Sequence, residues 1–127
     1  MKLLEYSVAF SIGSFAYTML EILWRGYTHW SMTLTGGACL ALLYMWNSLL
    51  PTAPLMLKCA IGALTITAVE FIVGCVFNRI LNLGVWDYSD VKYNILGQVC
   101  LPFTFLWFLL AIPGFYICDF IRKIMLL

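Results

Sequence analysis

The sequence predicts an all-α membrane protein in which four transmembrane helices form a tandem repeat of two-helix units, within a single domain of residues 1–127. Composition is the first observation behind this prediction. Apolar residues make up 64% of the chain and charged residues 10%, whereas soluble domains average about 45–50% and about 25%. So few charges cannot cover the surface of a small water-soluble fold, and the excess apolar surface therefore needs lipid or a large partner. Four apolar stretches and an internal repeat complete the prediction.

Each predicted span is an apolar stretch close to the roughly 20 residues that cross the hydrocarbon core as a helix. The four stretches cover about residues 4–24, 32–50, 55–78 and 95–121. Backbone amides in lipid must be hydrogen-bonded within their own segment, which favours helices over other structures. Pro102 and Pro113 fall in the fourth stretch, where they predict a kink and not an end.

The connection over residues 79–94 is the only long one between the spans. It is rich in large apolar and aromatic residues, which is atypical of a solvated linker. We therefore expect an ordered loop folded over the bundle, with Trp86 and Tyr88 docked against the helix ends. Asp87 would then face the neighbouring polar residues. It would either pair with Arg25, Arg79 or His29 in a structural role or orient His29 for proton transfer in a functional one.

Basic residues are distributed almost evenly between the two membrane sides. An even number of spans places both termini on one side, together with Lys2, Lys58, Arg122 and Lys123. The opposite side receives Arg25, Arg79 and Lys92. Because cytoplasmic loops carry the excess of Lys and Arg, four against three favours cytoplasmic termini. A difference this small also permits insertion in both orientations.

The two halves of the chain align, with residues of about 8–50 lying over about 57–111. The first block places the pattern Ile-Gly-x4-Thr-x2-Glu of residues 12–21 over residues 61–70. The other two blocks place residues 26–31 over 84–89 and residues 36–40 over 97–101. Two spans per repeat give both halves the same orientation, so we expect them to be related by an axis along the membrane normal.

Glu21 and Glu70 are the first candidates for function because a carboxylate within a span is costly and usually faces the bundle interior or a polar cavity. Arg25 follows Glu21 at ion-pair spacing, so that pair has either a structural or a functional role. Glu70 has no basic residue one turn away. It needs either a polar partner from another segment or a raised pKa that leaves it neutral. Glu70 is therefore the better functional candidate.

A polar crown is predicted on the membrane face opposite the termini, and its candidate binding or gating residues surround the two glutamates. They are Glu21, Arg25, His29, Glu70, Asn78, Arg79, Asp87, Asn94 and Gln98. Many ionisable groups that converge on one face are typical of a site, and two arginines could hold a phosphate or carboxylate head group. Aromatic residues interleave with them, as in an interfacial aromatic belt.

Several classes of function lack their sequence signals. A net charge of +1 argues against nucleic acid as a partner. Nucleotide-binding loops and metal-binding motifs are missing from the sequence, so we expect neither cofactor nor metal. The five cysteines have no zinc-ligand spacing and are interpreted as small packing residues.

Two motifs carry a resemblance to a known family. Residues 25–32, followed by Gly36 and Gly37, resemble the first half of the small bacterial membrane proteins named putative ABC-transporter type IV. Residues 85–89 (Val-Trp-Asp-Tyr-Ser), residues 94–101 and Trp107 are similar to the second half of that family. The resemblance implies a multi-pass protein of the bacterial inner membrane and assigns no catalytic residue.

Three functions remain open at the level of sequence. The leading interpretation is a small transporter or channel-like protein with its binding site or gate at the polar crown. Since four helices can hardly enclose a pathway alone, it would work as a homo-oligomer. An alternative is a membrane-embedded enzyme that acts on a lipid or lipid-linked head group at the crown. Another alternative is a non-catalytic partner subunit of a larger membrane complex.

Overall fold

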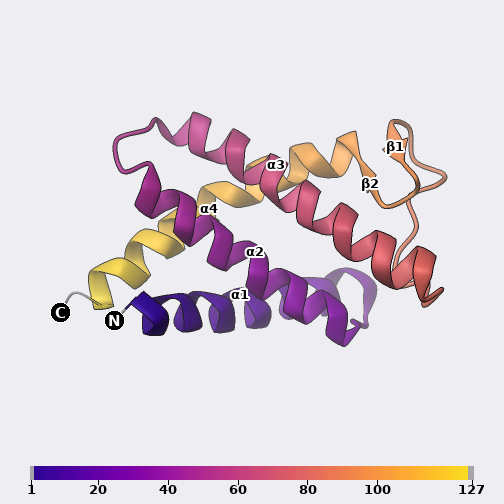
Figure 1. Cartoon of the computed structure of the whole chain (residues 1–127), viewed down its shortest axis with the longest axis horizontal. Helices are drawn as coiled ribbons and strands as arrows, with labels where there is room; N and C mark the ends of the chain where they lie inside the picture. Colours follow the sequence, from indigo (N-terminus) through magenta and orange to yellow (C-terminus); the bar gives the residue numbers. More distant parts are fainter. Residues whose placement is uncertain (1, 126–127) are drawn as a thin grey trace.

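The computed structural model describes residues 2–125, which form four long helices with one small hairpin before the last (Figure 1). The helices are α1 (Lys2–Arg25), α2 (Trp30–Leu49), α3 (Leu55–Gly74) and α4 (Leu101–Met125). A π-helical turn, η1 (Cys75–Ile80), continues α3, and β1 (Asn94–Ile95) pairs antiparallel with β2 (Val99–Cys100). Consecutive helices run in opposite directions, so both chain ends lie at the same end of the bundle (Figure 1). The predicted all-α class is confirmed.

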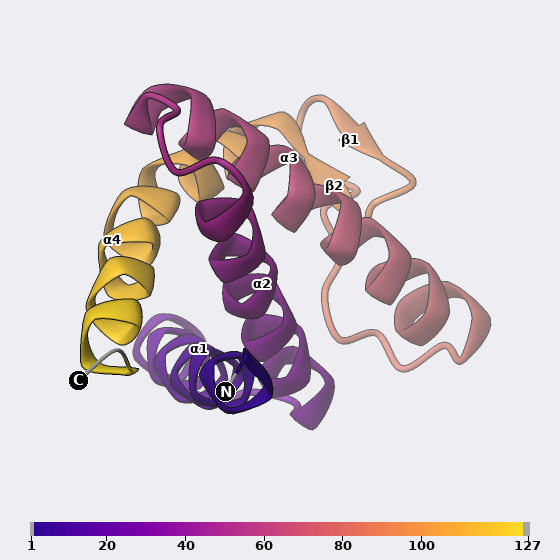
Figure 2. The same ribbon diagram turned by 60° about the vertical axis from the view of Figure 1, so that its left-hand side comes forward.

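Three helical segments are long and apolar enough to cross a membrane: Leu3–Arg25, Leu55–Ile80 and Leu101–Met125. The remaining helix, α2, is 20 residues long but contains buried polar and small residues such as Thr35, Gly36 and Asn47. It lies in the middle of the bundle and contacts α1, α3 and α4 (Figure 2). Protein atoms therefore surround the less apolar side chains of this helix, and the spans as a whole are those of a membrane protein.

The fourth helix begins at Leu101, later than the predicted start near residue 95. The intervening residues form the β1–β2 hairpin, where Tyr93, Leu96 and Gly97 have φ values of 61°, 53° and 73°. A helix cannot continue through the left-handed region, so the hairpin delays its start. Pro102 is then the second residue of α4, in the first turn where proline is well tolerated.

The closest helix pair is α1 and α2, and glycine makes their approach possible. A Cβ atom on Gly13 would lie 2.6 Å from the Cβ of Leu40 and 2.7 Å from the carbonyl oxygen of Gly36. Apolar burial drives little association in lipid, so small residues that let backbones approach are a main source of helix packing. Close contact between the backbones of α1 and α2 therefore stabilises the first helical hairpin.

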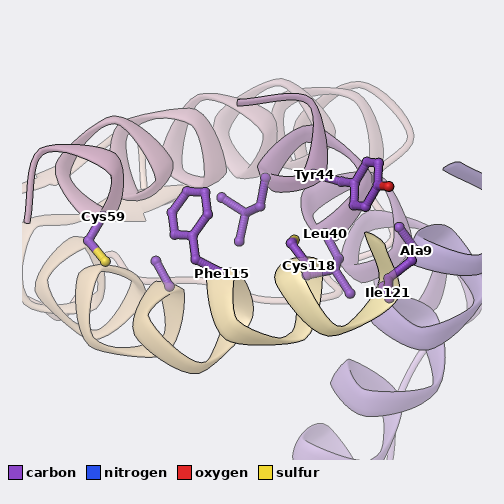
Figure 3. Packing of buried hydrophobic residues seen from close by; sticks show 9 residues of the cluster. Ala9, Leu40, Tyr44, Cys59, Phe115, Cys118 and Ile121 are labelled. Carbon is purple, nitrogen blue, oxygen red and sulfur yellow. The ribbon is translucent and has the colours of Figure 1, made fainter. Parts of the chain in front are cut away.

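An apolar core fills the half of the bundle near the chain termini and joins α1, α2, α3 and α4 (Figure 3). Its buried members are Ala9, Leu40, Leu43, Tyr44, Cys59, Ala111, Phe115, Cys118 and Ile121. Beside this core, the buried Nζ of Lys58 donates to Oδ1 of Asn47 at 2.8 Å, and Nδ2 of Asn47 donates to Oδ1 of Asp119 at 2.8 Å. This chain of hydrogen bonds ties α3, α2 and α4 together.

Candidate functional site

The segment between η1 and α4, residues 81–100, folds over one end of the bundle and is called here the cover loop. Val85 and Trp86 are buried and pack against Met32 at the start of α2. Asn78 of η1 fastens the loop: its Oδ1 accepts from the backbone N–H of Val85 at 2.6 Å, and its Nδ2 donates to Oε1 of Gln98 at 2.9 Å. The predicted docking of this loop against the helices is confirmed.

Glu70 lies beneath the cover loop, with a side chain that is only 4% exposed. Its Oε1 accepts from the indole N–H of Trp107 at 3.4 Å, and its Oε2 accepts from the hydroxyl of Tyr88 at 3.3 Å. The ring of Tyr88 is in turn stacked on Phe103, with 4.8 Å between ring centroids. The prediction of a buried Glu70 with a polar partner from elsewhere is confirmed, and both partners are neutral.

Glu21 has a different environment because Arg25 neutralises it. The Nε of Arg25 lies 2.8 Å from Oε2 of Glu21, at an angle that gives an ion pair without a good hydrogen bond. The hydroxyl of Tyr17 donates to the other carboxylate oxygen at 2.9 Å. Arg25 also donates from Nη1 to the carbonyl of Val85 at 3.1 Å. Among residues 2–125 this is the only ion pair, and it joins α1 to the cover loop.

Two aromatic rings connect the glutamates across the bundle. Tyr17, which binds Glu21, has its ring centroid 6.3 Å from that of Trp107, which binds Glu70. Trp107 is buried in α4, whereas Tyr17 comes from α1. The carboxylates therefore belong to one continuous site, in which only one of them has a cationic partner.

A cavity of about 420 Å³ adjoins this site. Glu70, Tyr17 and Trp107 contribute to its walls, and the rest of the lining is almost entirely apolar or glycine. This volume falls within the range of about 300–1,000 Å³ that is usual for small-molecule sites. Glu70 is the only member of the nine candidate residues in the cavity lining.

The other candidate residues lie outside the cavity, and His29 and Asn94 among them bind the surrounding backbone. His29 is the N-cap of α2, and its Nδ1 accepts from the backbone N–H of Ser31 at 3.2 Å. The same Nδ1 lies 2.7 Å from Oγ of Ser31. Asn94 accepts from the N–H of Gly97 at 3.0 Å and so closes the hairpin turn. Arg79 is exposed at the end of η1. The geometry of these side chains is that of caps, turns and surface.

The predicted pairing of Asp87 with Arg25, Arg79 or His29 is wrong. Its side chain is exposed, and its Oδ1 accepts from the backbone N–H of Ser89 at 2.9 Å and from the hydroxyl of the same residue. No described cation pairs with it. The Asp-x-Ser spacing lets the carboxylate bind the backbone two residues on, and this local bond outcompetes a distant partner. The serine hydroxyl, followed by its backbone N–H, lowers the pKa of Asp87.

Within residues 2–125, no three or more His, Cys, Asp or Glu side chains gather closely enough to hold a metal ion. The arrangement around Glu70 can instead bind one cationic group or exchange a proton.

Residues 8–126 match the family described as Putative ABC-transporter type IV. The chain belongs to this family. No solved structure matches it. The description of the putative ABC-transporter type IV family suggests a transporter-related membrane protein, and the three apolar helices fit a membrane protein.

Two residues of the site, Tyr17 and Trp107, were not predicted from the sequence. Tyr17 lies one helical turn before Glu21, and that spacing could have identified it as a hydrogen-bond partner. Trp107 approaches Glu70 from 37 residues away along the chain, so local spacing contains no signal for it. The Lys58–Asn47–Asp119 chain was also missed, although each residue is conspicuously polar within an apolar stretch.

Proposed function

We propose that this protein is a small membrane transporter in which Glu70 binds the transported cation or proton. The observation that carries the proposal is a buried carboxylate, on the wall of a cavity, whose hydrogen-bond donors are neutral. A carboxylate within a span is usually retained for function because of its insertion cost. Neutral donors leave its charge uncompensated, so a mobile cation can compensate it.

The depth of Glu70 supports this role. It follows Leu55 by 15 residues and precedes Ile80 by ten within the segment Leu55–Ile80. At about 1.5 Å per residue, the carboxylate lies about 22 Å from one end of the segment and about 15 Å from the other. A position near the middle of the bilayer suits a site that must be reached from both sides in turn.

The proposal includes α2 as a fourth span, because its less apolar side chains are covered by neighbouring helices. Four spans and chain ends at one end of the bundle (Figure 1) are consistent with both termini in the cytoplasm and residence in a bacterial inner membrane. We further propose a homo-oligomer, in which several copies form the pathway that four helices can hardly enclose.

A duplicated two-helix unit is also part of the proposal. With the 49-residue offset of the first aligned block, the end of α1 at Arg25 corresponds to the end of α3 at Gly74. The equivalent residues Thr18 and Thr67 each form a hydrogen bond to the following helix, at 2.7 Å to Thr33 and 2.9 Å to Thr104.

The third aligned block does not occupy equivalent structure in the two halves. Residues 36–40 lie in the middle of α2, whereas residues 97–101 form β2 and its junction with α4. The threonine contacts instead make Thr33, the fourth residue of α2, equivalent to Thr104, the fourth residue of α4. This corrected register is the one that a superposition of α1–α2 on α3–α4 would test.

Transport is tested with purified protein reconstituted into liposomes on a solid-supported membrane. Concentration jumps of Na⁺, K⁺, protons and organic ammonium ions are applied, and the charge displaced by the protein is recorded. We expect at least one cation to give a signal that Glu70→Gln abolishes and the control Glu5→Gln, at a carboxylate outside the cavity, retains. If every signal persists in Glu70→Gln, or if wild type gives none above empty liposomes, the proposal is wrong.

A further inference from the structure

The cavity beside Glu70 has the shape of a site for a compact organic molecule. Its volume is about 420 Å³. Gly13 and Gly36, which bring α1 and α2 together, also line it, as does Gly114 of α4. Larger side chains at these positions would reduce its volume. Apart from Glu70 and a few hydroxyl groups, the walls present hydrocarbon, sulfur and aromatic rings, so the ligand must be largely apolar.

Exposed residues of two apolar helices contribute to the cavity lining. Met19 and Leu20 of α1 line it and are 44% and 48% exposed, and the exposed Pro113 of α4 also lines it. These residues belong to the segments Leu3–Arg25 and Leu101–Met125, both apolar enough to cross a membrane. A ligand can therefore reach the cavity from the hydrocarbon core, provided that it partitions into lipid.

The charge of the cavity selects the charge of that ligand. Glu70 is the only acidic residue in the lining, and no Lys, Arg or His of residues 2–125 lines the cavity. Glu21, the nearest other carboxylate of the site, is paired with Arg25. The cavity thus offers one carboxyl group without a cationic partner, in apolar surroundings. A single positive charge on the ligand would balance it.

The chemistry of the walls separates organic from inorganic cations. Small metal ions require several oxygen ligands to replace their water shell, and one carboxylate in apolar walls supplies too few. A weakly hydrated cation with aromatic or alkyl substituents loses little on leaving water and gains apolar contact. The rings of Tyr17 and Trp107, which both line the cavity, add cation–π attraction.

We propose that the cavity binds lipophilic monovalent organic cations, with Glu70 as their counter-ion and Tyr17 and Trp107 as aromatic walls. This ligand class rests on the proposed transport function and specifies its substrate. A ligand of this class must carry one positive charge, have large hydrocarbon substituents and reach the cavity through lipid.

The test measures binding of tetraphenylphosphonium to the detergent-purified full chain by isothermal titration calorimetry. Wild type is compared with Glu70→Gln and with the matched control Glu5→Gln, because Glu5 accepts from the hydroxyl of Tyr44 and does not line the cavity. We expect binding that weakens at least 30-fold in Glu70→Gln and less than threefold in Glu5→Gln. Triphenylphosphine oxide, a neutral probe of similar chemistry, should bind wild type at least 30-fold more weakly than tetraphenylphosphonium. That comparison tests the charge requirement even if Glu70→Gln fails to fold.

The proposal is overturned if tetraphenylphosphonium and the neutral probe bind equally, or if Glu70→Gln folds and binds like wild type. It is also overturned if no probe binds and a co-purified phospholipid or a second copy of the chain occupies the cavity. Failure of the ligand class is distinct from failure of transport. Glu70-dependent currents from inorganic ions without phosphonium binding reject only the ligand class, whereas Glu70-dependent binding without any charge movement in liposomes rejects only transport.

Discussion

The two helical hairpins have the same sequence pattern but differ in their packing and in the state of their glutamates. In the first, α1 and α2 approach at backbone level through Gly13, and Glu21 is neutralised by Arg25. In the second, α3 is extended by η1, and the long cover loop precedes α4. Glu70 of this hairpin receives hydrogen bonds from neutral donors only.

Under the proposed duplication and the proposed transport function, this difference assigns a structural role to Glu21 and a functional role to Glu70. An ion pair within a single helix turn needs no other segment, so Glu21 and Arg25 can fix the first hairpin and its contact with the cover loop. Glu70 depends on donors from two other segments, and its charge stays available to a ligand. The following predictions compare the two hairpins, from the largest expected effect to the smallest.

Substitution of the equivalent glycines should destabilise the first hairpin far more than the second. A Cβ on Gly13 would meet the backbone oxygen of Gly36 at 2.7 Å and the Cβ of Leu40 at 2.6 Å, neither of which can move alone. A Cβ on Gly62 meets the flexible end of Leu43 at 2.8 Å. We expect Gly13→Ala to reduce the free energy of unfolding by about 2–3 kcal/mol and Gly62→Ala by less than about 1 kcal/mol, measured by SDS titration in detergent. Equal losses would contradict the difference in packing.

Removal of Arg25 should have an intermediate effect. Arg25→Met leaves the Glu21 carboxylate, which is 12% exposed, without its cation. Buried pairs cost several kcal/mol to break and exposed pairs much less, so a loss of about 1–2 kcal/mol is expected. The double variant Glu21→Gln, Arg25→Met should recover at least half of this loss in the same titration. No recovery would mean that the bond from Arg25 to the Val85 carbonyl accounts for the effect.

The interhelical threonine pairs should contribute equally to the two hairpins. Hydrogen bonds between membrane helices average about 0.6 kcal/mol in double-mutant cycles. A cycle of Thr18→Val with Thr33→Val, and one of Thr67→Val with Thr104→Val, should each give about that coupling energy. Coupling in one pair only would argue against the corrected repeat register.

The sequence was sufficient to predict the all-α membrane class and the burial of Glu70 with a polar partner. These follow from apolar length and from the cost of a carboxylate in lipid, which act locally along the chain. It was also sufficient to predict the docking of Trp86 and Tyr88, because an aromatic loop is costly to solvate.

The partners of Glu70 could not be predicted in the same way. Trp107 and the cavity arise from the packing of helices distant in sequence, and no spacing rule encodes that packing. The hairpin before α4 was missed because left-handed backbone conformations at Tyr93, Leu96 and Gly97 interrupt an otherwise apolar stretch. The third repeat block failed because shared residue types in an apolar chain do not fix structural register.

Asp87 is predicted to have the smallest effect, since its bonds are confined to its own turn. Asn at this position keeps a side-chain oxygen that can accept from the N–H and hydroxyl of Ser89. We therefore expect Asp87→Asn to bind tetraphenylphosphonium like wild type and to melt within a few degrees of it at pH 7.

The pH dependence of this variant has a definite sign. Hydrogen bonds from Ser89 hold the pKa of Asp87 below its ordinary value, so the ionised form stabilises the folded state. That contribution is fully present above the unfolded-state pKa of about 3.9 and is lost as the pH falls through the lower folded-state pKa. Any difference in melting temperature between wild type and Asp87→Asn should therefore be present at pH 7 and diminish below about pH 4. If Asp87→Asn loses phosphonium binding at pH 7 with an unchanged melting temperature, Asp87 acts on the site after all, and the assignment of a purely local turn is wrong.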